Sequence, residues 1–268
     1  MRRNLSADDG LHRIAGFALL SLMVLAGLSG CSGSGGGGDE GGISPSPEIV
    51  VNSLLDEAAP PAGIVTLRSA LASAGHGQRI TFDRALNGGT IDLLFVGEEH
   101  TALVGEVMGF DNANNISFLV GYFLRDYGRS ALFADKNVVI DASSLPDGIT
   151  VNWDGAVPAR VLAVYGDLWL TNVAITGGNS VFDVAADVGQ HPDDNQTSTL
   201  ARGAGIAVWG VATLSDCAIY DNHALGDDSD TSRDGGAYGG GVYADTVVMD
   251  NCVVSGNTVY GGGAAGGG

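Results

Sequence analysis

The stretch Leu168-Trp-Leu-Thr-Asn-Val-Ala-Ile175 occurs twice more in related form, as Ala212-Thr-Leu-Ser-Asp-Cys-Ala-Ile219 and Val247-Val-Met-Asp-Asn-Cys-Val-Val254. In each copy, apolar residues alternate with other residues on both sides of a central Asn or Asp. Alternation with a period of two is typical of short β-strands, and Asn or Asp tolerates the left-handed backbone of a sharp bend. We therefore expect Asn172, Asp216 and Asn251 to form a structural ladder of turns between pairs of strands.

A further short strand is predicted ahead of each copy, at 160–165, 205–209 and 241–244. The central residues of the copies are unequally spaced, which stacked repeats tolerate only when the extra residues form loops on one face. The polar segments 182–203 and 225–241 are predicted to be those loops. Three strands per repeat, with a bend between two of them, indicate an all-β solenoid of the parallel β-helix type.

One copy carries a resemblance to a known family. Gly239-Gly-Gly-Val-Tyr243 followed by Asp250-Asn-Cys-Val-Val-Ser-Gly-Asn257 resembles the repeats of polymorphic outer membrane proteins. In those repeats a Gly-Gly-Ile-Tyr element precedes a Cys-x-Ile-x-Gly-Asn element. The resemblance is best over residues 203–260, because Asp221-Asn222 replaces Gly-Asn in the second copy and Val173 replaces Cys in the first. It implies a right-handed parallel β-helix on a bacterial surface.

Residues 63–83 resemble the amino-terminal cap of bacterial right-handed β-helix surface proteins, which usually carry Leu-Arg-Glu/Asp-Ala before an Ile-Thr-Phe strand. Here Ser69 stands in place of the acid. The residues themselves predict an amphipathic helix, because four apolar side chains fall on one narrow face. They are Leu67, Ala70, Leu71 and Ala74, with Thr66 as the N-cap. Because a β-helix leaves an apolar end open, we expect this helix to cover it.

Residues 1–30 are predicted to be a lipoprotein signal peptide. A positive start precedes the apolar run 14–28, which is shorter than the roughly 20 residues needed to span a bilayer. Leu28-Ser-Gly-Cys31 resembles the bacterial lipobox, in which the cysteine thiol takes a diacylglyceryl group. The resemblance implies that Cys31 is lipidated and anchors the protein to the outer membrane or cell surface; the alternative is an ordinary secretory signal that happens to contain Cys31.

The remaining chain divides into four predicted parts. Residues 31–47 form a flexible Gly/Ser-rich tether, and residues 48–96 form the N-terminal cap and first coils. Residues 97–136 do not repeat and are predicted to be an inserted hairpin packed on the side of an early coil. Residues 137–268 form the β-helix coils, and the glycines at 261–268 resemble the opening of a further coil, so we expect an uncovered apolar edge there.

Cys217 and Cys252 occupy equivalent positions in adjacent copies. Stacked strands would place them about 4.8 Å apart. We interpret them as buried free thiols that act as small hydrophobic side chains, because stacked side chains point in parallel and not toward each other. A disulfide in an oxidising envelope is the alternative.

An acidic loop is the candidate metal site. Residues 227–234 contain four carboxylates, and Asp228, Asp230 and Asp234 are the candidate ligands for calcium, which binds six to eight oxygen atoms. The loop lacks the residue order of an EF-hand, and a solvated acidic loop is the favoured interpretation. No other cofactor is expected.

Composition and motifs limit the function. With 12 basic and 31 acidic residues the net charge is −19, which argues against a nucleic-acid partner. No catalytic residue is assigned, and tryptophans 169 and 209 lie on predicted strands, where core packing is the default. We expect a surface-displayed lipoprotein that acts in adhesion, or in glycan or protein-partner binding through its coil loops. The alternative is a polysaccharide lyase or hydrolase on the same fold.

Overall fold

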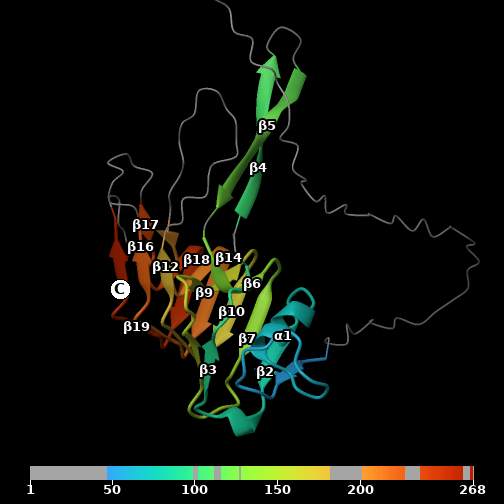
Figure 1. Cartoon of the computed structure of the whole chain (residues 1–268), viewed down its shortest axis with the longest axis vertical. Helices are drawn as coiled ribbons and strands as arrows, with labels where there is room; N and C mark the ends of the chain where they lie inside the picture. The colour runs from blue at the N-terminus through green and yellow to red at the C-terminus, as the bar shows by residue number, and fades with distance from the viewer. Residues whose placement is uncertain are drawn as a thin grey trace, which may run out of the picture. The chain divides into compact units, whose positions relative to one another are not determined.

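The computed structural model describes residues 47–98, 102–111, 116–126, 128–181, 201–226, 236–261 and 266–267 (Figure 1). The chain divides into two compact units, Met1–Ser44 and Pro45–Gly268, and every described residue belongs to the second. The predicted signal peptide, Cys31 and almost all of the tether lie outside the described residues. The same holds for the calcium candidates Asp228, Asp230 and Asp234.

Parallel β-sheet dominates the described chain, which confirms the all-β prediction at the level of fold class. The long sheet contains β1 (Ile49–Val51), β2 (Arg79–Phe82), β7 (Val138–Asp141), β10 (Leu168–Thr171), β14 (Ile206–Ser215) and β18 (Val242–Asp250). The first residues of β14 also pair with β9 (Arg160–Val164), which pairs with β6 (Ser130–Ala134).

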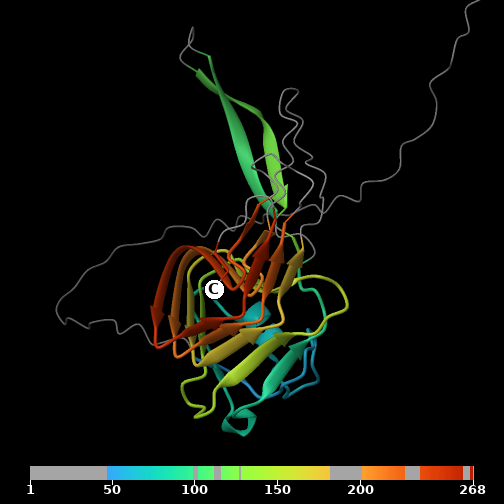
Figure 2. The same ribbon diagram turned by 90° about the vertical axis from the view of Figure 1, so that its left-hand side faces the viewer.

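Two smaller parallel sheets are formed by the strands that come next in each repeat. The second contains β3 (Thr90–Leu93), β8 (Ile149–Trp153), β11 (Val173–Thr176), β15 (Ala218–Tyr220) and β19 (Val253–Ser255). The third contains β12 (Asn179–Val181), β16 (His223–Leu225) and β20 (Thr258–Tyr260). Each of the segments 160–181, 206–225 and 242–260, which we call the three repeats, therefore contributes strands to every one of these sheets. Figure 2 shows those strands side by side, coloured from yellow to red.

The repeats stack in the register that their sequences predict. Leu168 pairs with Ala212 and Ala212 with Val247, so the quoted copies align residue for residue. Asn172, Asp216 and Asn251 have φ values of 55°, 55° and 51°, and each lies at the bend between the long sheet and the second sheet. A positive φ is uncommon for residues other than glycine, and the short polar side chains of Asn and Asp tolerate it best.

The structure differs from the sequence analysis in three places. A further strand follows each copy, in β12, β16 and β20, in addition to the strands that we predicted ahead of and within each copy. The parallel strands resume at β6, within the predicted insertion 97–136, after the antiparallel hairpin of β4 (Ala102–Asp111) and β5 (Ile116–Asp126). The predicted loops are also not free of strand, because β13 (Ala201–Arg202) pairs in parallel with β17 (Ala237–Tyr238). The strands β12, β13, β16, β17 and β20 have only two or three residues each, too few for alternation to reveal them.

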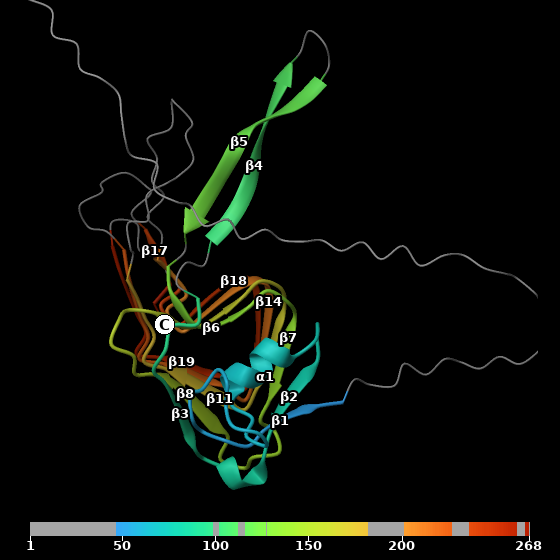
Figure 3. The ribbon, with the colours of Figure 1, turned by 45° about the vertical axis from the view of Figure 1, so that its right-hand side comes forward.

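The helix α1 (Leu67–Ser73) closes the core at the N-terminal end, as its apolar face predicts. Leu67, Ala70 and Leu71 are at most 3% exposed and join one core with Ile80 and Ile91 of the first two sheets. Figure 3 shows α1 lying between these sheets. The other helical segment of the described chain is a short 3-10 helix at Arg84–Leu86.

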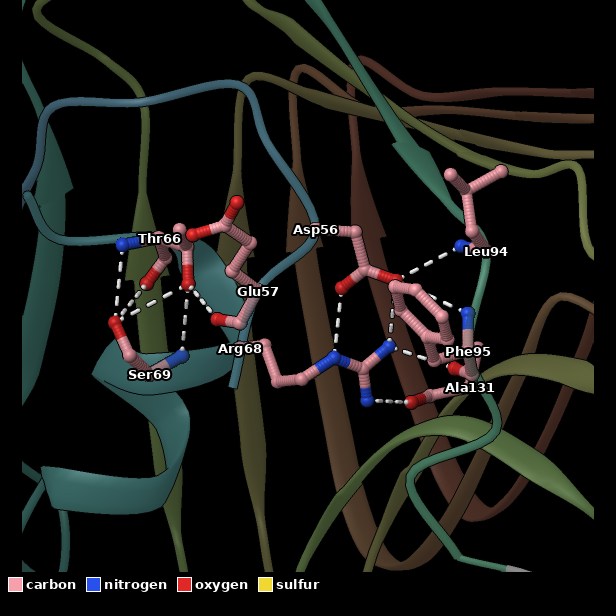
Figure 4. Close-up of polar contacts among 8 residues, drawn as sticks. All are labelled: Asp56, Glu57, Thr66, Arg68, Ser69, Leu94, Phe95 and Ala131. Atoms are coloured by element: carbon pink, nitrogen blue, oxygen red, sulfur yellow. Dashed lines mark hydrogen bonds and ion pairs between the residues drawn. The ribbon is translucent and has the colours of Figure 1, made fainter. Parts of the chain in front are cut away.

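The N-terminus of α1 shows why serine can replace the expected acid at position 69. The Thr66 side chain accepts a hydrogen bond from the Ser69 backbone N–H at 3.1 Å, and the Ser69 hydroxyl accepts one from the Thr66 N–H at 2.9 Å (Figure 4). This reciprocal capping box satisfies two backbone donors that a helix start leaves unpaired. Serine therefore performs at this position the role that a longer acid usually performs.

A buried ion pair ties α1 to the first strands. The Asp56 carboxylate accepts bonds from Arg68 Nε at 2.7 Å and Nη2 at 2.9 Å, and from the backbone N–H groups of Leu94 and Phe95 (Figure 4). Arg68 Nη1 also donates to the Ala131 carbonyl at 2.6 Å. The Asp56 side chain has no exposed surface and that of Arg68 is 11% exposed. The bidentate pair therefore joins four separate segments around the covered end.

Two buried asparagines form a ladder at the turns between the second and third sheets. The Asn222 side chain accepts a bond from Gly178 N–H at 2.9 Å and donates to Asn257 Oδ1 at 2.9 Å. Asn257 Oδ1 also accepts from the Asn222 N–H at 3.1 Å, and its amide group donates to the Ile219 carbonyl at 2.8 Å. Each buried amide thus bonds with the backbone of the neighbouring repeat.

Candidate functional site

The outward-facing residues of the long sheet form two straight rows across its strands. Successive residues of a strand face opposite sides, so the partners of an outward residue are also outward. The first row is Arg79, Val139, Trp169, Thr213 and Val248. The second row is Thr81, Asp141, Thr171, Ser215 and Asp250. We call these ten residues the outer rows; the residues between them face the inner side of the sheet.

Trp169 is the aromatic residue of the outer rows. This residue is 38% exposed, whereas Leu168 and Leu170 on either side are at most 1% exposed. Core packing, the default for a tryptophan on a strand, is therefore wrong here, because the alternation of β10 directs Trp169 outward. Trp153 does lie in the core, where its indole N–H donates to the Val157 carbonyl, and Trp209 stacks on Tyr165 with ring centroids 4.5 Å apart.

A shallow hollow of about 440 Å³ adjoins Trp169. Its lining combines the tryptophan and Val139 with an ion pair in which Arg79 Nη1 lies 2.9 Å from Asp141 Oδ2. The Arg79 side chain is 52% exposed and that of Asp141 is 13% exposed. An exposed aromatic face with a donor and an acceptor beside it suits a ligand that has both apolar ring faces and hydroxyl groups.

The outer rows provide an extended surface. Neighbouring strands lie about 4.8 Å apart, so the five strands from β2 to β18 place the ends of a row about 19 Å apart. Trp169 stands in the middle of its row, and the second row offers hydroxyl or carboxylate groups on all five strands. This arrangement suits a linear ligand that crosses the strands.

The spacing of the carboxylates in the outer rows does not suit glycoside hydrolysis. Asp141 and Asp250 are separated by three strand steps, which corresponds to about 14 Å. Paired carboxylates lie about 5–5.5 Å apart in retaining glycosidases and about 6.5–9.5 Å apart in inverting ones. The spacing of these two carboxylates therefore fits neither of the two glycosidase geometries.

A second hollow, of about 580 Å³, lies beside the turn ladder. The amide of Asn251 donates to Asp216 Oδ1 at 2.6 Å, and the amide of Asn172 donates to the Leu145 and Ala142 carbonyls at 2.6 and 3.2 Å. These side chains bond with each other and with the backbone. The polar side chains of the ladder are therefore held in hydrogen bonds within the fold.

The two thiols are stacked and form no disulfide. Cys217 is buried and Cys252 is half-buried, and both are free. Cys252 Sγ accepts a bond from the Cys217 N–H at 3.4 Å, while each thiol donates to the carbonyl two residues before it. Burial raises the pKa of Cys217 to about 11, so this thiol stays protonated at neutral pH and behaves as a small apolar group.

Within the described ranges we looked for two further features, a metal-binding cluster and a membrane-spanning helix. Among these residues, no group of three or more His, Cys, Asp or Glu side chains is arranged to hold a metal ion. No helix there has both the length and the apolar character needed to cross a membrane. The calcium hypothesis for Asp228, Asp230 and Asp234, and the lipidation of Cys31, stay predictions.

Sequence reasoning did not single out Arg79, Asp141 or an outward Trp169. The signal was present, since Gln78-Arg-Ile-Thr-Phe82 and Asn137-Val-Val-Ile-Asp141 both alternate. Aligning these two strands with the first repeat would have placed Arg79 next to Val139 and Trp169, but the insertion between them hid the register.

Comparison with known proteins finds no matching family model, no matching curated protein and no matching solved structure.

Proposed function

We propose that this protein is a lipid-anchored bacterial surface protein whose right-handed parallel β-helix binds an extended glycan and so acts in adhesion. Three parallel sheets shared by in-register repeats support the β-helix. The right hand follows the general preference of parallel β crossovers, and the resemblance to outer membrane repeats agrees with it. The lipobox-like Leu28-Ser-Gly-Cys31 supports the anchor.

The glycan assignment depends on one observation: Trp169 lies exposed beside the Arg79–Asp141 pair in the middle of the outer rows. The indole face packs against the apolar face of a sugar ring, and the ion pair exchanges hydrogen bonds with its hydroxyl groups. The hydroxyl and carboxylate groups of the second row extend these contacts along the ligand. The site is thus proposed on the sheet face, with the loops 182–203 and 225–241 as additional contacts.

The negative net charge of the protein favours uncharged glycans over anionic ones. The net charge of −19 repels polyanionic chains, and the outer rows carry two aspartates against one arginine. We therefore expect a neutral polysaccharide or oligosaccharide as the ligand.

A glycan array with the purified full-length chain tests this function. We expect binding to neutral oligosaccharides, and Trp169→Ala weakens it at least about tenfold because the stacking surface is lost. Tyr260→Ala is the matched control: this aromatic side chain is 60% exposed but lies on β20 in the third sheet. Equal binding by Trp169→Ala and the unchanged chain would exclude the outer rows as the site.

The enzyme alternative is tested with the same ligands. Incubation with neutral and acidic polysaccharides, with and without calcium, is expected to leave the chains intact by size-exclusion chromatography and to produce no absorbance from unsaturated sugars. Reproducible cleavage that persists in Trp169→Ala would place catalysis elsewhere on the fold.

The anchor is tested independently of the glycan. Cells that express the full-length chain are labelled with a fatty-acid precursor, and we expect label in the protein but none in Cys31→Ala. Ser32→Ala, which alters the adjacent residue, keeps the label. Equal labelling of Cys31→Ala would remove the lipoprotein assignment.

A further inference from the structure

The thiols of Cys217 and Cys252 have the same orientation in successive repeats. Each Sγ lies 3.2 Å from the carbonyl oxygen two residues before it. Each also lies 3.4 Å from a leucine carbonyl oxygen in the preceding repeat, that of Leu170 for Cys217 and that of Leu214 for Cys252. These two leucines are partners in the long sheet, so the two thiols are related by a single step from one strand to the next.

The resulting spacing of the sulfur atoms suits a bridging metal ion better than a disulfide. Neighbouring strands lie about 4.8 Å apart, so two thiols of the same orientation place their sulfur atoms at about that distance. Two metal–sulfur bonds of about 2.3 Å in line span about 4.6 Å, which the pair reaches by a shift of about 0.2 Å. A disulfide bond is about 2.05 Å long, so its formation requires an approach of about 2.7 Å.

Two sulfur atoms on opposite sides of an ion form the ligand set of a soft, two-coordinate cation. Thiolate ligands select Cu(I), whereas structural zinc sites have four ligands in a tetrahedron. The surroundings also suit such an ion, because Cys217 belongs to the apolar core and Cys252 packs against it. An apolar shell limits the access of water to a metal and favours its less hydrated, reduced form.

The backbone stabilises the sulfur atoms in their charged form. The Cys217 N–H donates to Cys252 Sγ at 3.4 Å. Desolvation by burial raises the pKa of Cys217, while a backbone hydrogen bond from Val173, the equivalent residue of the first repeat, lowers it. Each sulfur therefore has a backbone donor that stabilises the thiolate once a cation has displaced the proton.

The site is reached from the third repeat. Cys217 is buried, whereas Cys252 is half-buried. Met249, which faces inward in the same repeat as Cys252, is 41% exposed, so within the described chain the inner side of this repeat is open to solvent. An ion that enters from this side meets Cys252 first and Cys217 second.

We propose that Cys217 and Cys252 bind one Cu(I) ion in linear coordination between their sulfur atoms. Binding replaces two S–H bonds with two Cu–S bonds, the two protons pass to solvent, and copper stays in the Cu(I) state. Because one ligand lies in the second repeat and the other in the third, the bound ion joins the two repeats and stabilises the folded chain.

Copper binding by the reduced, full-length chain under anaerobic conditions tests the proposal. Cu(I) is supplied as its bicinchoninate complex, and we expect the chain to take up one ion and X-ray absorption to show two sulfur neighbours at about 2.3 Å. Cys217→Ser and Cys252→Ser should each lower the affinity at least about a hundredfold, since loss of groups that merely support a ligand already costs up to about that much. Val254→Ser, which alters another inward residue of β19, is the matched control and should keep the affinity.

Three outcomes would overturn the proposal. The first is unchanged affinity in Cys252→Ser, whose half-buried position lets the variant keep the fold, as its circular dichroism spectrum checks. The second is loss of copper binding in Cys31→Ala, which should still take up one ion because the site does not include that thiol. The third is a disulfide between Cys217 and Cys252 in protein isolated from cells, detected by mass spectrometry, because it removes both ligands.

Discussion

The two ends of the parallel sheets have the same kind of core but different surroundings. At the N-terminal end Leu67 and Leu71 of α1 cover the first strands and are at most 3% exposed. At the C-terminal end Val247 and Met249 repeat the inward pattern of the layer beneath and are more than 40% exposed. The comparison shows that alternation of apolar residues determines which way a side chain faces, while burial depends on whether another layer lies above it.

The covered end also has more polar contacts than the open end. The covered end is joined by the Asp56–Arg68 pair, which bonds to four segments, and by the capping box at Thr66. At the open end, the described residues show one backbone hydrogen bond to the chain that follows, from the Gly240 N–H to the Gly266 carbonyl. Substitutions at the covered end should therefore cost more stability than matched substitutions at the open end.

The largest expected effect is that of Asp56→Ala. Removing the carboxylate leaves the Arg68 guanidinium buried without its charge partner, which costs about 3–5 kcal/mol of unfolding free energy. Urea unfolding followed by circular dichroism measures it. The control is Arg79→Ala, which breaks an ion pair whose arginine is half exposed and should cost less than about 1 kcal/mol. Similar losses in both variants would show that the buried pair does not secure the covered end.

The next effect compares apolar side chains at the two ends. Leu71→Ala removes a buried side chain beneath the cap and should cost about 2–5 kcal/mol. Met249→Ala removes a side chain of similar size from the open end and should cost less than about 1 kcal/mol. Thermal unfolding of both variants gives the difference. A Met249→Ala loss as large as that of Leu71→Ala would mean that the open end is covered in solution.

A smaller effect is expected at the helix cap. Thr66→Ala removes the side chain that bonds the Ser69 N–H and the Glu57 carbonyl, and should cost about 1 kcal/mol. Ser73→Ala, at the last residue of α1, is the control and should change the unfolding free energy by no more than about 0.5 kcal/mol. Unchanged stability of Thr66→Ala would indicate that the packing of α1 alone holds the cap.

The smallest effect concerns the thiols. Burial raises the pKa of Cys217 from 9.0 to about 11, so folding favours its protonated form. This contribution to stability is complete below pH 9 and is lost as the pH rises toward 11. Unfolding at pH 8 to 11 should show a smaller decline for Cys217→Ala than for Cys252→Ala. At pH 8 a thiol reagent should modify the half-buried Cys252 before Cys217, and the reverse order would contradict the placement of Cys252 toward the open end.

The repeats and the cap could be predicted because both depend on local patterns. Alternation around Asn172, Asp216 and Asn251 defined two strands per repeat, and helical spacing from Leu67 to Ala74 defined the covering face. Such patterns reflect the periods of strand and helix, which each segment carries by itself.

The strand that follows each copy and the outer rows could not be predicted in this way. β12, β16 and β20 have three residues each, too few for a period to be recognised. The outer rows depend on the register between Arg79 and Val139, which lie 60 residues apart with the β4–β5 hairpin between them. Register across an insertion is a property of the assembled sheets, so the sequence of either strand alone does not contain it.

The asparagine ladder has a consequence for how the chain folds. The Gly178 N–H finds its acceptor in the second repeat, and the Asn222 N–H finds its acceptor in the third. When the next repeat docks it removes water from this amide donor and supplies the acceptor in its place; without that acceptor the buried donor would cost about 1–3 kcal/mol. The ladder therefore couples the stability of each repeat to that of its neighbour, as in a cooperative array.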